Sequence, residues 1–148
     1  MKEAYFDSTY LFKVHCVEYG TTEVRACAAT MDCVVSALHG RAEFASACHR
    51  KMREKSGTQE HLKEMLAQLE METHLGALRW LPITKDIVAL VESIYQCAPA
   101  HIFLRASDAL HLACAAHHGF KEIYSNDQHL LAAAPLFGLK GLNIIPLR

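Results

Sequence analysis

Short apolar runs alternate with longer amphipathic segments along the whole chain. The short runs are typical of β-strands, and they predict strands at 3–7, 33–36, 78–83, 122–125 and 142–146. The longer segments repeat apolar side chains at helical spacing, and they predict helices at 9–17, 21–29, 40–55, 59–75, 85–97, 107–118 and 128–134. A chain that alternates strand and helix in this way is typical of the α/β class.

Strands that are separated by helices are expected to pair in parallel through right-handed crossovers. The sequence therefore predicts a three-layer α/β/α sandwich. Pro82 lacks a backbone N–H, so we expect the third strand to lie near an edge of the sheet. The sequence has no repeat, low-complexity stretch or linker, and residues 1–148 are expected to form one domain.

Composition narrows the classes of function. The chain is 51% hydrophobic with a net charge of -1, so no overall basic field attracts nucleic acid, and any contact with a polyanion needs a local patch. The six cysteines form no C-x-x-C pair, and we interpret them as buried, reduced thiols of a cytoplasmic protein. No apolar run reaches the roughly 18 residues of a membrane span, and the N-terminus does not resemble a targeting peptide, so no membrane contact is expected.

Four carboxylates occupy positions where a parallel sheet binds ligands. Asp7 and Asp127 each follow a predicted strand, Glu43 lies in the helix after the second strand, and Asp108 begins an almost wholly apolar helix. Ligands of such sheets bind beyond the carboxyl ends of the strands. We therefore expect the four acids at one edge of the sheet, where their oxygens would suit a hard cation such as Mg²⁺ or Mn²⁺.

Each acid also has an ordinary structural explanation. Asp7 and Asp127 could cap the helices that follow them, and Glu43 could be a surface residue of its helix. For Asp108, the alternative is a cap by Ser107 with a favourable contribution from the helix dipole. Asp108 is the hardest to explain in this way, because its helix is apolar nearly all round and buried acids are rare unless they are paired or bind a metal.

Softer metals are the main alternative to magnesium. Ten histidines and six cysteines include the pairs Cys48-His49 and Cys114 with His117-His118, but no second pair has the spacing of a structural zinc site. We expect His111 to be a packed or hydrogen-bonded histidine rather than a ligand. The chain has no glycine-rich phosphate loop, no G-x-S-x-G and no H-E-x-x-H motif.

The ordered set of motifs resembles the PIN-domain family, and within it the VapC-type toxins of toxin–antitoxin pairs. The resemblance extends over essentially the whole chain and rests on the set rather than on any one motif. The residues that carry it are Tyr5-Phe6-Asp7-Ser8-Thr9, Val35-Ser36-Ala37, Glu43-Phe44-Ala45-Ser46-Ala47, Arg105-Ala106-Ser107-Asp108-Ala109-Leu110-His111 and Tyr124-Ser125-Asn126-Asp127. The first motif reads Asp-Ser-Thr, where Asp-Thr-Ser is commoner in the family, and His39-Gly40-Arg41 precedes Glu43 where the family usually has a smoother helix start.

This resemblance implies a central parallel five-stranded sheet, a Mg²⁺- or Mn²⁺-dependent ribonuclease, and a homodimer that an antitoxin inhibits. Asp7, Glu43, Asp108 and Asp127 match the acidic quartet of the family. Ser125 matches the small hydroxyl residue before the last acid, and Asn126 matches a position that is often Asn or Asp.

A divalent cation at such a site would activate water and clamp a phosphate oxygen. We expect Asp7 and Asp108 to be direct ligands, Asp127 to be a ligand directly or through water, and Glu43 to hold the attacking water or a second ion. Clustered acids repel one another, so at least one should have a raised pKa. The side chains that could orient the carboxylates are Ser8, Thr9, Ser125 and Asn126.

Lys13 and Arg105 are the nearest candidates for contact with RNA phosphates, and their alternative is solvated surface charge. The leading hypothesis is an endoribonuclease toxin with an RNA substrate and a cognate antitoxin. A PIN-fold nuclease of RNA maturation and a non-catalytic binding module are the alternatives. The helices at 40–55 and 59–75 could form a groove for a partner, although core packing is the preferred interpretation of their inner faces.

Overall fold

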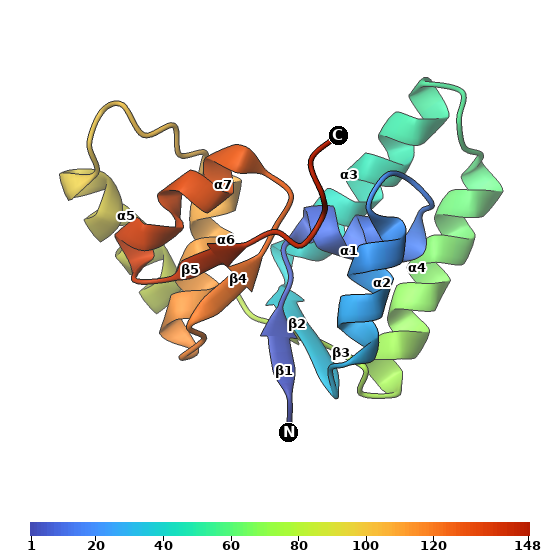
Figure 1. Cartoon of the computed structure of the whole chain (residues 1–148), viewed down its shortest axis with the longest axis horizontal. Helices are drawn as coiled ribbons and strands as arrows, with labels where there is room; N and C mark the ends of the chain where they lie inside the picture. Colours follow the sequence, from blue (N-terminus) through green and yellow to red (C-terminus); the bar gives the residue numbers. More distant parts are fainter.

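Strands and helices alternate along the chain as the sequence predicts. The computed structural model describes residues 1–148 and contains five strands and seven α-helices (Figure 1). Their order is β1 (Glu3–Tyr5), α1 (Ser8–His15), α2 (Thr21–Ala29), β2 (Cys33–Ala37), α3 (His39–Arg53), α4 (Gln59–His74), β3 (Leu78–Leu81), α5 (Lys85–Cys97), α6 (Ala106–His117), β4 (Glu122–Tyr124), α7 (Gln128–Ala133), a 3₁₀ turn (Ala134–Phe137) and β5 (Lys140–Leu142).

The strands are all parallel, but they form two sheets rather than one. β1, β2 and β3 make a three-stranded sheet in that order, and β4 pairs with β5. A single bridge between Phe6 and Tyr124 joins the two sheets, together with a hydrogen bond of 3.1 Å from the N–H of Asp7 to the carbonyl of Tyr124. The expected continuous five-stranded sheet is therefore not confirmed. β1 and β4 are only three residues long, and the chain enters α1 at Ser8, so little backbone is left for a ladder between the two sheets.

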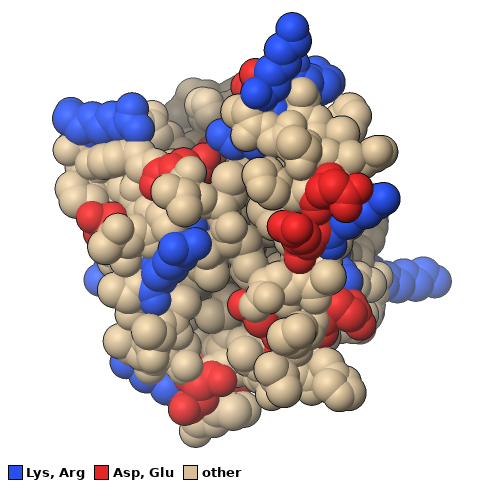
Figure 2. Space-filling view, turned by 90° about the vertical axis from the view of Figure 1, so that its right-hand side faces the viewer, with Lys and Arg blue, Asp and Glu red and all other residues tan.

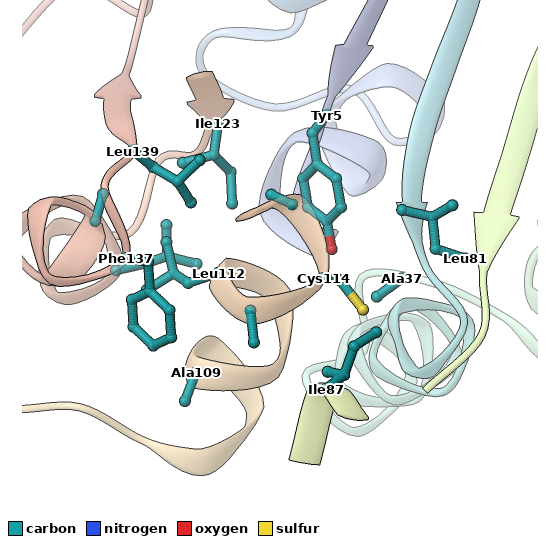
Figure 3. Packing of buried hydrophobic residues seen from close by; sticks show 14 of the residues in the cluster. Tyr5, Ala37, Leu81, Ile87, Ala109, Leu112, Cys114, Ile123, Phe137 and Leu139 are labelled. Atoms are coloured by element: carbon teal, nitrogen blue, oxygen red, sulfur yellow. The ribbon is translucent and has the colours of Figure 1, made fainter. Parts of the chain in front are cut away.

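Helices cover both faces of this pair of sheets, because successive side chains of a strand point to opposite sides. Tyr5 points toward α6 and α5, and Figure 3 shows its ring directed at Cys114. The neighbouring Ala4 and Phe6 point to the other face, where α1, α2, α3 and α4 pack. Full burial of a side chain such as Phe6 stabilises the fold by roughly 1.5–3 kcal/mol.

Two strands have other bounds than the sequence predicts. The last strand is Lys140–Leu142 and not 142–146. Gly141 lets this strand approach α7, because a Cβ there would lie 2.8 Å from a methyl carbon of Leu131. The third strand ends at Leu81, before Pro82, and β3 is an edge strand as predicted.

The helices begin and end within about two residues of the predicted bounds, because their caps are local. Helix α5 has the predicted range 85–97, and the hydroxyl of Thr84 accepts a hydrogen bond from the N–H of Ile87 at its start. The inner faces of α3 and α4 pack in the core through Phe44, Cys48 and Leu69, which confirms the core-packing interpretation.

The cysteines are all free, as expected, but the prediction that all six are buried is wrong. Cys33, Cys48 and Cys114 are buried, whereas Cys16 and Cys27 are half-buried and Cys97 is exposed. None of the helices combines the length and the apolar character that crossing a bilayer requires.

Candidate functional site

A cavity of about 680 Å³ opens at the carboxyl ends of the strands, and all four predicted acids line it. Asp7 follows β1, Glu43 lies in α3 after β2, Asp108 lies in the first turn of α6, and Asp127 follows β4. The cavity is also lined by Ser8, Thr9, Phe12, Lys13, Glu18, Ala42, Ser46, Ala47, Arg50, Arg105, Ser107 and Asn126. The predicted gathering of the acids at one edge is therefore found.

Asp7 is a helix cap as well as a cavity residue. Its Oδ1 accepts hydrogen bonds from the backbone N–H of Tyr10 at 3.2 Å and from the Thr9 hydroxyl at 2.6 Å. Its Oδ2 accepts one from the Ser125 hydroxyl at 2.5 Å. Burial raises the pKa of Asp7, and the charge of His111 and these hydrogen bonds oppose that rise. The capping alternative is thus correct for Asp7, yet the carboxylate remains buried at the base of the cavity.

Asp108 and Asp127 share one counter-ion, Arg105. The guanidinium Nε donates to Asp108 Oδ2 at 3.1 Å, and a terminal nitrogen donates to Asp127 Oδ2 in a very short contact. Burial and the charge of Asp127 raise the pKa of Asp108, whereas Arg105 lowers it. Asp7 and Asp108 thus both have a raised pKa, as expected for at least one of the acids, but burial is the main cause in each and only Asp108 is raised by a second acid.

Asp127 also caps α7, because its Oδ1 accepts from the N–H groups of His129 at 2.8 Å and Leu130 at 3.2 Å. The Ser107 cap that was considered for α6 is wrong. Helix α6 has no side-chain cap, and the Ser107 hydroxyl instead donates to Glu43 Oε2 at 2.7 Å.

Glu43 is held by a chain of hydrogen bonds that reaches into the core. Its Oε1 lies 2.5 Å from His111 Nε2, and the other ring nitrogen of His111 lies 2.7 Å from the Tyr5 hydroxyl. Burial alone would raise the pKa of Glu43, but the hydrogen bonds from His111 and Ser107 and the nearby histidine charges lower it to about 2. Glu43 is therefore ionised over the whole physiological pH range.

A glycine allows this arrangement. A Cβ at Gly40, in the first turn of α3, would lie 3.2 Å from the Ser36 hydroxyl and 3.3 Å from His111 Cε1. The absence of a side chain lets α3 approach β2 and α6 closely, and this approach brings Glu43 to His111. The glycine just ahead of Glu43 thus fixes the acid in place.

Ser125 connects two of the acids. Its buried hydroxyl donates to Asp7 and accepts from the N–H of Asp127 at 2.9 Å. Thr9 accepts from the N–H of Asn126 at 2.9 Å, which fastens α1 to the loop after β4. Ser8 lines the cavity and makes no hydrogen bond with the acids.

The two predicted phosphate-binding side chains are both engaged within the protein. Lys13 is buried and donates to Glu18 at 3.0 Å and to the carbonyl of Tyr19 at 2.7 Å. Arg105 is half exposed and bridges two acids. The sequence reasoning missed Arg50, which is exposed at the cavity, is free of ion pairs, and lies two helical turns after Glu43 on α3. That spacing of seven residues could have revealed it.

The sequence reasoning also missed His39, and it anticipated His111 only as a packed, hydrogen-bonded residue. His111 is almost fully buried and hydrogen-bonded, as expected. His39 lies four residues before Glu43 on the same helix, with its Nε2 3.7 Å from Glu43 Oε1 and 3.0 Å from the Ser107 carbonyl. Burial and the neighbouring His111 lower the pKa of His39, so this ring is neutral at pH 7.

The donor set of the cavity suits a hard divalent cation, because it consists of carboxylate oxygens that carry more negative charge than Arg105 neutralises. The carboxylate oxygens of Asp7, Asp108 and Asp127 do not all lie within 4.8 Å of one another. The only three side chains with potential ligand atoms within 4.8 Å of one another are His39, Glu43 and His111.

Comparisons with known proteins point to one family. The PIN domain model matches residues 4–135. No curated protein matches the chain. Among solved structures, the chain is similar to Mycobacterium tuberculosis VapC20, a sarcin-ricin loop cleaving toxin, with a TM-score of 0.69 and 15% identity over 88% of this chain and 94% of that one. It is also similar to a chain of FitAB bound to the IR36 DNA fragment, with a TM-score of 0.69 and 16% identity over 98% of this chain and 97% of that one.

Proposed function

Because the chain belongs to the PIN domain family, we propose that it is a metal-dependent endoribonuclease whose residues 1–148 act as one nuclease domain. The observation that carries the proposal is the cavity at the strand ends, which four acids from four separate parts of the chain line together. Four carboxylates in one cavity repel one another, and Arg105 pairs with only two of them, so a bound cation would stabilise the arrangement.

The three aspartates are the proposed metal ligands. Asp7, Asp108 and Asp127 would hold Mg²⁺ or Mn²⁺, and this ion would lower the pKa of a bound water and clamp a phosphate oxygen. Ser125 orients two of the three through its hydrogen bonds to Asp7 and to the backbone of Asp127. Thr9 orients Asp7 from the other side, and Ser8 and Asn126 complete the wall of the cavity.

Glu43 is the proposed base for the attacking water. Its pKa of about 2 keeps it ionised, and hydrogen bonds from His111 and Ser107 fix the direction of its oxygens. A carboxylate in a fixed orientation can hold a water at hydrogen-bond distance and accept its proton. Because its pKa is low, Glu43 holds a proton only weakly. Its main contribution would therefore be to orient the attacking water.

RNA would be bound by a few cationic side chains rather than by a basic surface. In Figure 2 both signs of charge are scattered over the face that it shows, with broad neutral areas between them. Arg50 at the cavity is free for phosphate, and Arg105 would become free if a metal took its place beside Asp108 and Asp127. Lys13 would attract phosphate only through its charge and without direct contact, because it stays bound to Glu18.

A toxin of a toxin–antitoxin pair is the biological role that we propose for this nuclease. VapC20, which shares the fold, is a toxin that cleaves the sarcin-ricin loop. We accordingly propose an RNA substrate, a cognate antitoxin, a homodimer and a cytoplasmic location. A nuclease of RNA maturation would use the same cavity without an antitoxin, and a binding module would use the fold without cleavage.

The test is cleavage of an RNA pool by the purified protein with Mg²⁺, with Mn²⁺ and with a chelator. We expect cleavage only with metal, and Asp108→Asn should lower the rate at least about 100-fold. Asp86→Asn on α5 is the matched control, since that acid is exposed and remote from the cavity. A folded protein that cleaves no RNA with either metal, or cleavage that Asp108→Asn leaves intact, would refute the proposal.

A further inference from the structure

Three potential ligand atoms converge beside the carboxylate cavity. His39 and Glu43 lie one turn apart on α3, and His111 reaches them from α6. Glu43 Oε1 lies 2.5 Å from His111 Nε2 and 3.7 Å from His39 Nε2, and the three donor atoms all fall within 4.8 Å of one another. This is a tighter group than any that the aspartates of the cavity form.

His111 and Glu43 are held in their orientations by partners outside the group, and His39 Nε2 donates to the carbonyl of Ser107 at 3.0 Å. The far nitrogen of His111 is hydrogen-bonded to the buried Tyr5 hydroxyl at 2.7 Å. The second oxygen of Glu43 accepts from Ser107. Histidine ligands of metals commonly have their second nitrogen fixed by such a partner, which sets the ring orientation and raises the basicity of the ligand. His111 and Glu43 therefore have the support that metal ligands need, whereas His39 would exchange its contact with the Ser107 carbonyl for the metal.

The chemistry of this group differs from that of the cavity. Two imidazoles and one carboxylate suit a borderline transition ion such as Zn²⁺, whereas Mg²⁺ prefers oxygen ligands throughout. Imidazole binds a metal through a nitrogen that has lost its proton, so binding by this group would release protons. Zinc bound by three protein ligands keeps a fourth position open, and here that position would face the cavity that Glu43 lines.

We propose that His39, Glu43 and His111 form a second metal site that binds Zn²⁺ or a similar transition ion. Zinc ligands in a tetrahedron lie about 3.3 Å from one another. The contact of Glu43 with His111 would lengthen, and its 3.7 Å contact with His39 would shorten slightly. The Glu43 side chain is part exposed and would rotate, and the two imidazole rings, whose centroids lie 4.2 Å apart, would also move.

Such a site has a consequence for cleavage, and this part rests on the proposed nuclease function. Glu43 would serve both sites, since it lies between His111 and the cavity. A zinc ion that takes Glu43 Oε1 as a ligand withdraws that oxygen from the attacking water. Zinc would therefore inhibit cleavage in the presence of Mg²⁺, by binding beside the magnesium site and not in it.

Binding is tested first without RNA, with Co²⁺ as a spectroscopic probe and Zn²⁺ as its competitor. We expect one Co²⁺ per chain with the intense visible absorption of a four-coordinate site, displaced by one Zn²⁺. His39→Ala should weaken both at least about 10-fold, because it removes a direct ligand and even indirect partners contribute that much. His49→Ala, on the exposed side of the same helix, is the matched control and should bind as the wild type does.

Cleavage is then measured in Mg²⁺ with rising Zn²⁺. Each protein is compared with its own rate in Mg²⁺ alone, and zinc should lower the rate of the wild type but not that of His39→Ala, which lacks one of the zinc ligands. Equal Co²⁺ and Zn²⁺ binding by wild type and His39→Ala would overturn the proposal, as would binding that Asp108→Asn abolishes. If Co²⁺ binding depends on His39 but no variant cleaves RNA, the metal site stands and the nuclease proposal fails.

Discussion

Replacing Arg105 by glutamine removes the positive charge that lies between Asp108 and Asp127. The guanidinium makes an ion pair with each acid, and it is about half exposed while the acids are mostly buried, at 11% and 20% exposure. Ion pairs with an exposed partner contribute about 0.2–1 kcal/mol each. Loss of both should lower the free energy of unfolding of the metal-free protein by about 1 kcal/mol, or about 2–4 °C in Tm.

The effect of magnesium on this variant should be the opposite. Arg105 and the proposed ion compete for the same two carboxylates, so wild type gives up its ion pairs when it binds Mg²⁺ and the glutamine variant has none to lose. The two proteins should be equally stable at saturating Mg²⁺. The stability difference of about 1 kcal/mol between the metal-free proteins must then appear in the binding of Mg²⁺, so the variant should bind Mg²⁺ with a Kd about fivefold lower.

The assay is thermal unfolding of both proteins at low ionic strength, with a chelator and across a Mg²⁺ titration. Arg53→Gln on α3 is the control, because that arginine is exposed and has no ion pair. A Tm difference between Arg105→Gln and wild type that stays the same with and without Mg²⁺ would refute the competition, since the cation would then bind elsewhere.

The pH dependence gives an independent check with a definite sign. Asp108 has a folded pKa above its ordinary 3.8, so the folded protein holds this proton more tightly than the unfolded chain does. Its contribution to stability is therefore full at low pH and is lost as pH rises from 3.8 through the raised pKa. Arg105 lowers that pKa, so Arg105→Gln should make the loss larger. The two proteins should converge in acid and diverge toward neutrality.

Two other substitutions test how the acids are held. Gly40→Ala gains about 1 kcal/mol of helix propensity but adds a methyl group 3.2–3.3 Å from Ser36 and His111. We therefore expect a net destabilisation of at most about 2 kcal/mol in denaturant unfolding, and at least about a 10-fold loss of RNA cleavage. Unchanged cleavage would contradict the role of the glycine. Ser125→Ala removes a hydrogen bond to Asp7 and leaves the backbone N–H of Asp127 unpaired, so the free energy of unfolding should fall by about 1–3 kcal/mol. A Ser8→Ala control that is equally destabilised would count against this explanation.

Much of this fold was predictable because the signals are local. Thr84 marks the start of α5 and Pro99 follows its end, so the predicted range 85–97 is confirmed. The same holds for the acids at the strand ends, because parallel topology dictates the edge at which they meet. Their capping roles at Asp7 and Asp127 were also foreseen, as alternatives to metal binding.

Contacts between distant parts of the chain could not be predicted. Residues 142–146 have a strand-like pattern, but the ladder forms at Lys140–Leu142 because Gly141 can approach Leu131, which no local signal reveals. The apolar side chain of Ile145 packs in the core without a strand, and its N–H bonds to the Asn143 side chain.

The group of His39, Glu43 and His111 could not be predicted either, because it too depends on contacts between distant parts of the chain. His39 precedes Glu43 by four residues, a spacing visible in the sequence, yet the group becomes apparent only when α6 brings in His111. Arg105 was predicted to bind phosphate or to be solvated. Its actual partners, Asp108 and Asp127, depend on the approach of two segments that lie 22 residues apart.

The bridge between the two sheets has a consequence for the order of events during synthesis. The hydrogen bond from Ser125 to Asp7 spans 118 positions, so Asp7 is translated long before the hydroxyl group that orients it. Contacts of such long range form late in folding, because loop closure over that distance is costly. A nascent chain that has not yet released β4 has neither Ser125 nor Asp127 in place. The emerging polypeptide thus lacks a complete carboxylate cluster until Asp127 has left the ribosome.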